Sequence, residues 1–147
     1  MNKQELIVSI EKILAFLKLT NKDVIVVAQS AAVLSDFMDK ADGVSFIVSK
    51  STFRCLTEIF PSVTVDTEGV KILIAIDKVQ VSIGVNINFA SRKSSACVSG
   101  GYLCEGPVST FWRLTSLPKS ENSRRGLKAL EEHINKSVTH RDHCKVN

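Results

Sequence analysis

The sequence lacks most of the patterns that mark a catalytic nucleophile, a disulfide framework or a targeting segment. It has no Gly-x-Ser-x-Gly elbow, and its 3 histidines all lie at position 133 or later, which argues against serine nucleophile chemistry. Its 4 cysteines show no Cys-x-x-Cys spacing, so we expect thiols that act as small buried hydrophobic groups. Charges at Glu5, Glu11 and Lys12 interrupt the apolar N-terminal run. This pattern argues against a signal peptide or membrane span, so we expect a cytoplasmic protein with no membrane partner.

The length and composition are those of an ordinary globular domain. The 147 residues suffice to bury a core without disulfides or metal ions, and fractions of 44% hydrophobic and 23% charged residues argue against disorder. No repeat, low-complexity stretch or linker divides the chain. We therefore expect one domain over residues 1–136, followed by a flexible tail over 137–147.

The positive charge is unevenly distributed along the chain. The formal net charge is +4, and the last thirty positions hold a concentration of basic residues: Lys119, Arg124, Arg125, Lys128, Lys136, Arg141 and Lys145. An anionic partner is expected to dock there, although a solvated helix face is the simpler interpretation.

Apolar spacing predicts alternating helices and strands. Leu6, Ile10 and Ile13 share one face of a helix over 2–18, and the β-branched run over 24–27 predicts a buried strand. Further expected elements are a helix over 29–38, a strand over 44–48, a helix capped by Ser51 or Thr52, strands over 63–65, 70–76, 79–86 and 102–104, a helix from Pro107 that ends by Leu117, and a helix over 120–134. Residues 91–95 are expected to form a loop. The order predicts an α/β or α+β fold with a single mixed sheet flanked by helices.

Two short segments connect this order of elements to a known family. Gln29-Ser30 follows the first strand at the start of a helix, and Gly43-Val44-Ser45 opens the second strand after a polar break. The arrangement resembles the minimal nucleotidyltransferase fold. In that family a Gly-Ser or Gly-Gly pair at the first position approaches the nucleotide phosphates, and an Asp-x-Asp pair at the second holds magnesium. The resemblance implies phosphate binding near Gln29 and Ser30, although Ser30 is alternatively a plain helix cap.

The positions that match the magnesium ligands carry no carboxylate. Gly43 offers no side-chain ligand, Ser45 offers only a neutral hydroxyl, and the strand over 79–86 contains no acid. Nucleotidyl transfer requires two divalent cations about 4 Å apart, which carboxylates hold. We therefore expect no catalytic residues, no metal site and no cofactor. Arg124, Arg125 and Lys128 are further candidates for phosphate contacts, either in a nucleotide or in RNA.

Three functional hypotheses follow. The leading one is a catalytically defective nucleotidyltransferase-like protein that binds a protein partner, with a nucleotide or RNA as a second ligand. The first alternative is an active magnesium-dependent nucleotidyltransferase whose metal site uses Asp42, Asp66 or Asp77. The second is an unrelated α+β interaction module, in which the strands over 24–27 and 44–48 would not pair with each other or with 79–86. The sequence does not specify an oligomeric state.

Overall fold

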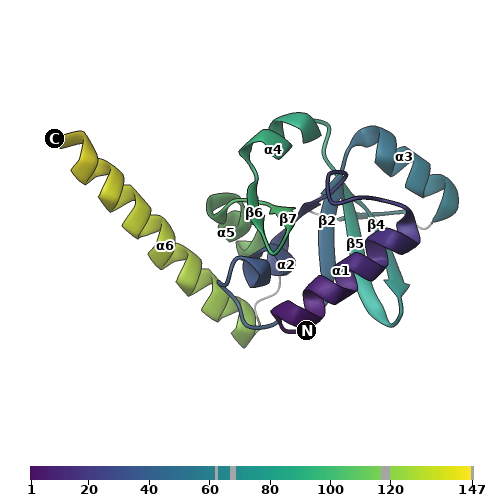
Figure 1. The fold of residues 1–147 in the computed structure, drawn as a ribbon, viewed down its shortest axis with the longest axis horizontal. Coiled ribbons are helices and arrows are strands. Elements are labelled where there is room, and N and C mark those ends of the chain that lie inside the picture. The colour runs from purple at the N-terminus through teal and green to yellow at the C-terminus, as the bar shows by residue number, and fades with distance from the viewer. Residues whose placement is uncertain (62, 67–68, 117–119, 147) are drawn as a thin grey trace.

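The computed structural model describes the backbone of residues 1–61, 63–66, 69–116 and 120–146, and the side chains of these residues except 63–66 and 138–146. Its elements follow the order shown in Figure 1: α1 (Lys3–Leu17), β1 (Ile25–Val26), α2 (Ala28–Leu34), β2 (Val44–Val48), α3 (Lys50–Ile59), β3 (Val63–Asp66), β4 (Gly69–Ile76), β5 (Val79–Val85), α4 (Phe89–Ser95), β6 (Cys97–Ser99), β7 (Tyr102–Cys104), α5 (Pro107–Thr115) and α6 (Glu121–Val146).

The strands form one mixed sheet in the order β3-β4-β5-β2-β1-β7-β6. β1 runs antiparallel to β2, with Ile25 opposite Ile47, whereas β2 runs parallel to β5, with Val44 opposite Val81. The expectation of a single mixed sheet with helices is confirmed, and the fold is α+β. Because β1 pairs with β2 and β2 pairs with β5, the unpaired strands that would have favoured an unrelated module are not found among these described strands.

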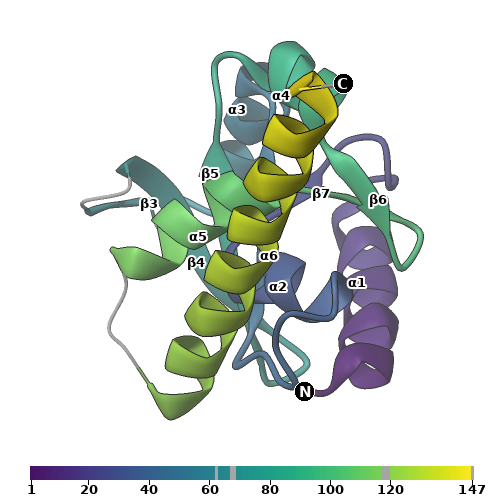
Figure 2. The same ribbon diagram turned by 90° about the vertical axis from the view of Figure 1, so that its left-hand side faces the viewer.

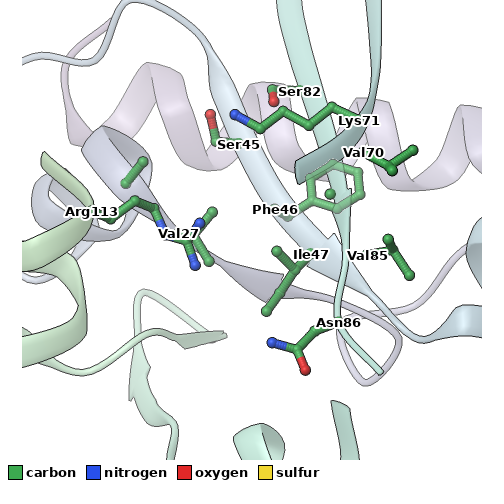
Figure 3. Close-up of a pocket in the computed structure, with 12 residues that line it drawn as sticks. Val27, Ser45, Phe46, Ile47, Val70, Lys71, Ser82, Val85, Asn86 and Arg113 are labelled. Carbon is green, nitrogen blue, oxygen red and sulfur yellow. The ribbon is translucent and has the colours of Figure 1, made fainter. Parts of the chain in front are cut away.

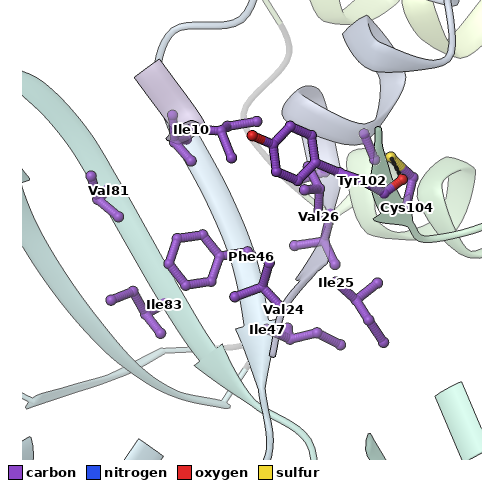
Figure 4. Packing of buried hydrophobic residues seen from close by; sticks show 14 of the residues in the cluster. Ile10, Val24, Ile25, Val26, Phe46, Ile47, Val81, Ile83, Tyr102 and Cys104 are labelled. Atoms are coloured by element: carbon purple, nitrogen blue, oxygen red, sulfur yellow. Dashed lines mark hydrogen bonds between the residues drawn. The ribbon is translucent and has the colours of Figure 1, made fainter. Parts of the chain in front are cut away.

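One face of the sheet is buried beneath α1. Val44, Phe46 and Val48 alternate along β2 toward this face, and none is more than 1% exposed. Ile83 of β5 and Ile10 of α1 belong to the same buried cluster, and Figure 4 shows both beside the Phe46 ring. Full burial of a side chain of this size contributes about 1.5–3 kcal/mol to stability. This face therefore supplies much of the core.

Helix α1 is closed at both ends by local signals. The Asn2 side chain accepts a hydrogen bond from the Glu5 amide at 2.9 Å, and the Glu5 carboxylate accepts one from the Asn2 amide at 3.2 Å. This capping box satisfies two amides that the helix leaves unpaired. Lys18 ends the helix in the left-handed conformation with φ of 58°. These ends match the predicted helix over 2–18 closely.

Helix α2 is shorter than predicted. It ends at Leu34 instead of Met38, because the chain turns through Asp36 with φ of 66° and the amide of Phe37 bonds back to Ala32 at 2.8 Å. Met38 is still buried after this turn. A tight turn after Leu34 therefore brings Met38 to the core, as a longer helix would also have done. Apolar periodicity alone does not distinguish these two structures.

Three other elements differ from the prediction. The N-cap of α3 is Ser49, whose side chain accepts from the Thr52 amide at 3.3 Å, and not Ser51 or Thr52. The predicted loop over 91–95 belongs to α4, which buries no residue and so has no apolar period to detect. Strand β6 was not predicted, because it is a three-residue edge strand that pairs with β7 through a Gly100-Gly101 turn.

Helix α6 continues to Val146, past the predicted end at Ile134, since no glycine or proline interrupts residues 127–146. Figure 2 shows α6 passing in front of α2 with α5 at its left, and Figure 1 shows its C-terminal end extending beyond the sheet. Gly126 packs against Met38 so closely that a Cβ there would overlap that side chain. The flexibility expected of residues 137–147 stays a prediction.

Candidate functional site

The second face of the sheet is polar at its centre. Ser45 of β2 lies opposite Ser82 of β5, and Ile47 lies opposite Gly84, so these residues alternate with the buried set and point to the other side. On β4, Lys71 is the register partner of Gly84. Ser45, Ser82 and Lys71 are each partly exposed. The strand pairing thus gathers two hydroxyls and an ammonium group on one surface.

A cleft of about 310 Å³ occupies this surface. It lies between the sheet, the start of α2 and α5, and its lining residues are Val27, Ala28, Ser45, Phe46, Ile47, Val70, Lys71, Ser82, Gly84, Val85, Asn86 and Arg113. Figure 3 shows the Lys71 side chain lying across the strands with its Nζ toward Ser45, while Arg113 enters from the other side. The volume is in the range of small-ligand pockets.

The charged groups of the cleft are basic. Lys71 and Arg113 line it, and no Asp or Glu occurs among its described lining residues. Arg113 is held in place by Glu105 at the end of β7, through Nη2 to Oε2 at 2.7 Å and Nε to both carboxylate oxygens at 3.2 Å. The Glu105 side chain is only 6% exposed, so this ion pair is largely shielded from water. Part of the Arg113 charge is therefore balanced by the Glu105 carboxylate.

Ser30 connects α2 to the beginning of β2. Its hydroxyl donates to the Gly43 carbonyl at 3.1 Å and accepts from the Ser45 amide at 3.0 Å, and the residue is 1% exposed. The helix-cap interpretation is wrong, because the N-cap of α2 is Val27. Ser30 instead positions the backbone of Ser45 at the edge of the cleft.

Gln29 makes a second connection between distant segments. Its Nε2 donates to the Ser123 hydroxyl of α6 at 2.9 Å, and its Oε1 accepts from the Asp42 amide at 3.2 Å. Both polar ends of this side chain thus have partners within the fold, and neither Gln29 nor Ser30 lines the cleft. The two residues expected to contact phosphate therefore bond to other parts of the fold and do not line the cleft.

The two positions that match the family's magnesium ligands have different surroundings. Ser45 lines the cleft, whereas Gly43 does not. A Cβ atom built at Gly43 would lie 2.6 Å from the carbonyl oxygen of Gln80, which is closer than real Cβ contacts. An aspartate would therefore not fit at position 43 unless β5 shifted.

The predicted basic group on α6 lies apart from the cleft. Arg124, Arg125 and Lys128 are exposed on α6, and none lines the cleft. Arg125 forms an exposed ion pair with Glu121 one turn earlier, with Nη2 to Oε1 at 3.0 Å. A pair of this kind contributes about 0.3–0.5 kcal/mol. The structure therefore does not bring these residues together with Ser45.

The alternative acids are also dispersed where they are described. Asp42 is exposed in the loop before β2, and Asp77 lies in the β4–β5 turn with φ of 49°, while the side chain of Asp66 lies outside the described residues. Ser82 lies three strand positions beyond Val79 at the start of β5, or roughly 10 Å from the turn that holds Asp77 at about 3.3 Å per residue. Among described residues, no three His, Cys, Asp or Glu side chains gather as metal ligands would.

Sequence reasoning missed Lys71 and Arg113 as site residues. Lys71 is a single charged residue in an otherwise apolar strand. Arg113 belongs to a short helix and follows Ser82 by 31 positions, so sequence spacing does not connect the two. The available signal was the acid-free strand over 79–86, whose Ser82 and Gly84 share a face. Placing Lys71 beside them required the register between β4 and β5.

The comparisons with known proteins identify no relatives. The sequence matches no protein-family model and no curated protein, and no solved structure matches the fold. Within the described part of the chain, no helix has both the length and the apolar character needed to cross a membrane.

Proposed function

We propose that this chain is a nucleotidyltransferase-like protein that binds rather than catalyses, and that its cleft holds a phosphate-bearing ligand such as a nucleotide without a divalent cation. The observation that carries this proposal is the chemistry of the cleft lining. It combines Lys71 and Arg113 with the hydroxyls of Ser45 and Ser82, and its described residues contain no carboxylate.

The cleft offers donors that suit a phosphate group. Lys71 supplies an ammonium group, and each serine supplies a hydroxyl donor at the same surface. Hydrogen bonds between charged donors and phosphate oxygens are roughly twice as strong as neutral ones. Hard divalent cations prefer carboxylate oxygens, which the two serines do not provide. The same surface that suits an anion is therefore poor for magnesium.

The direct test is calorimetric titration of the full chain with ATP, in EDTA and in magnesium buffer. We expect saturable binding in EDTA, with an affinity that magnesium changes by less than about threefold, or ~0.7 kcal/mol. Binding that occurs only with magnesium would contradict the proposal.

A second measurement separates binding from catalysis. The chain is incubated with labelled nucleoside triphosphates, magnesium and cell extract, and we expect no label on any protein or RNA. Label transfer that Asp42→Ala abolishes would instead support the active nucleotidyltransferase.

The protein partner expected from the sequence is a second candidate function, and the outer face of α5 favours it. Trp112 is 66% exposed and Val108 is 54% exposed, and they lie one turn apart on this helix. Exposed aromatic residues often anchor protein interfaces. We expect Trp112→Ser to remove a co-purifying protein, whereas Phe16→Ser on α1, which replaces an aromatic of 61% exposure, retains it. Equal recovery with both variants would contradict this assignment.

A further inference from the structure

The hairpin of β6 and β7 places two cysteines directly opposite each other. Cys97 and Cys104 are register partners, and the strands are joined by Gly100 and Gly101, with φ of 60° and 86°. Opposed residues in antiparallel strands have Cα atoms about 4.5 or 5.5 Å apart, and disulfides span Cα separations of about 4.4–6.8 Å. Both kinds of strand pair therefore meet the backbone requirement for a disulfide.

The two thiols have contrasting environments. The expectation of buried thiols is confirmed for Cys104 but wrong for Cys97 and Cys55, which are exposed. The Cys104 Sγ lies 3.7 Å from the Tyr102 carbonyl and 3.9 Å from the Ser99 carbonyl as a hydrogen-bond donor. The pKa of Cys104 is raised to about 12, mainly by burial and to a smaller extent by the neighbouring Cys97. The solvent-exposed thiol of Cys97 therefore lies next to the buried thiol of Cys104.

We propose that Cys97 and Cys104 form a reversible modification site, in which a small disulfide such as oxidised glutathione converts the two thiols into a cross-strand disulfide. The site depends only on the hairpin and is independent of the proposed function of the cleft.

The chemistry proceeds in two exchanges. The Cys97 thiol loses its proton, and the thiolate attacks one sulfur of oxidised glutathione, which forms a mixed disulfide and releases one glutathione that takes up a proton. The Cys104 thiol then loses its proton and attacks the Cys97 sulfur, which expels the second glutathione. Two protein thiols are oxidised, and one glutathione disulfide is reduced to two thiols. Excess reduced glutathione reverses both steps.

The cross-link would join β6 to the segment that precedes Glu105. Cys104 precedes Glu105, whose carboxylate holds Arg113, and the Glu105 amide donates to the Val26 carbonyl of β1 at 2.9 Å. A disulfide would tie the edge strand β6 to this anchored segment. We expect slower amide hydrogen exchange in β6 after oxidation.

The test uses a Cys55→Ser/Cys144→Ser variant, which keeps only the opposed pair. The folded variant is treated with excess oxidised glutathione, alkylated, and digested with chymotrypsin without reduction, because cleavage after Tyr102 separates the two cysteines. We expect the intact chain to lose two hydrogen atoms and the Cys97 and Cys104 peptides to remain joined until reduction. The same digest of the native sequence should contain the same linked pair.

The matched control adds Cys104→Ser to this variant. It should stop at a glutathione adduct on Cys97. An adduct on Cys97 in the parent variant without a linked pair, a disulfide between two chains, or no reaction at all would each overturn the proposal.

Discussion

The two faces of β2 differ although the same five residues form both. Val44, Phe46 and Val48 point into the core and are almost inaccessible, whereas Ser45 points into a cleft that also holds Lys71 and Ser82. The buried face stabilises the fold through apolar contact. On the other face, Ile47 is buried as well, and the polar character is confined to the end of β2 that carries Ser45. If the cleft binds the proposed ligand, we expect substitutions at Ser45 to alter binding and substitutions at Phe46 to alter stability.

The largest expected effect is a difference in the free energy of unfolding between substitutions on the two faces of β2. Phe46→Ala should lower the free energy of unfolding by about 3–5 kcal/mol, because it removes a fully buried ring and leaves a cavity. Ser45→Ala, the adjacent position on the polar face, should change it by less than about 1 kcal/mol. Urea unfolding of both variants measures this difference. Equal losses in the free energy of unfolding would show that the two faces do not differ in their contribution to stability.

The ion pair of the cleft gives the next effect. Arg113→Ala should cost about 2 kcal/mol, because it leaves the Glu105 carboxylate, whose side chain is 6% exposed, without its cation. Arg113→Ala combined with Glu105→Gln should recover part of that loss, since the neutral amide costs less to bury. Thermal unfolding of the two variants and the native chain measures the recovery. If the double variant is the least stable of the three, Glu105 is not held by Arg113.

The approach of β5 to Gly43 provides a third test. Gly43→Ala should lower stability by about 1–3 kcal/mol, because the added Cβ would crowd the Gln80 carbonyl. Gly106→Ala is the control, since nothing lies within 4 Å of a Cβ at that position. If urea unfolding shows both variants equally stable, position 43 has room for the family's aspartate.

The smallest effect concerns pH and the buried face. Burial raises the pKa of Cys104 from 9.0 to about 12, so the unfolded chain loses this proton at lower pH than the folded one. The contribution that protonated Cys104 makes to the free energy of unfolding is therefore complete below pH 9. Above pH 9 the free energy of unfolding should fall by roughly 1 kcal/mol per pH unit. Urea unfolding between pH 7 and 10 should show a shallower decline for Cys104→Ala than for Cys55→Ala. Parallel declines would contradict the assignment.

The sequence was informative where one residue type repeats on one face. Leu6, Ile10 and Ile13 predicted α1 correctly, and the β-branched runs predicted the central strands. The sequence-based prediction failed for elements whose formation depends on tertiary structure. Nothing in α4 is buried, so no apolar period marks it, and Asp36 ends α2 by a backbone turn.

The candidate site was predicted only in part. Ser45 lines the cleft, but Ser30 and Gln29 do not, because their side chains bond to Gly43, Asp42 and Ser123 within the fold. Lys71 and Arg113 reach the same cleft from elements far apart in the chain. Their proximity depends on strand register and on the Glu105 ion pair, and neither can be read from local spacing.

The most direct test of the central claim compares two lysines of the β4–β5 hairpin. Lys71 lines the cleft, whereas Lys78 lies in the exposed turn and does not line it. Lys71→Gln and Lys78→Gln each remove one positive charge, and ATP is titrated into each in EDTA, with thermal unfolding as a check of the fold. We predict that Lys71→Gln weakens binding about tenfold, or ~1.4 kcal/mol, and that Lys78→Gln leaves it within about twofold. Equal affinities for the two variants would contradict the assignment of phosphate binding to the cleft.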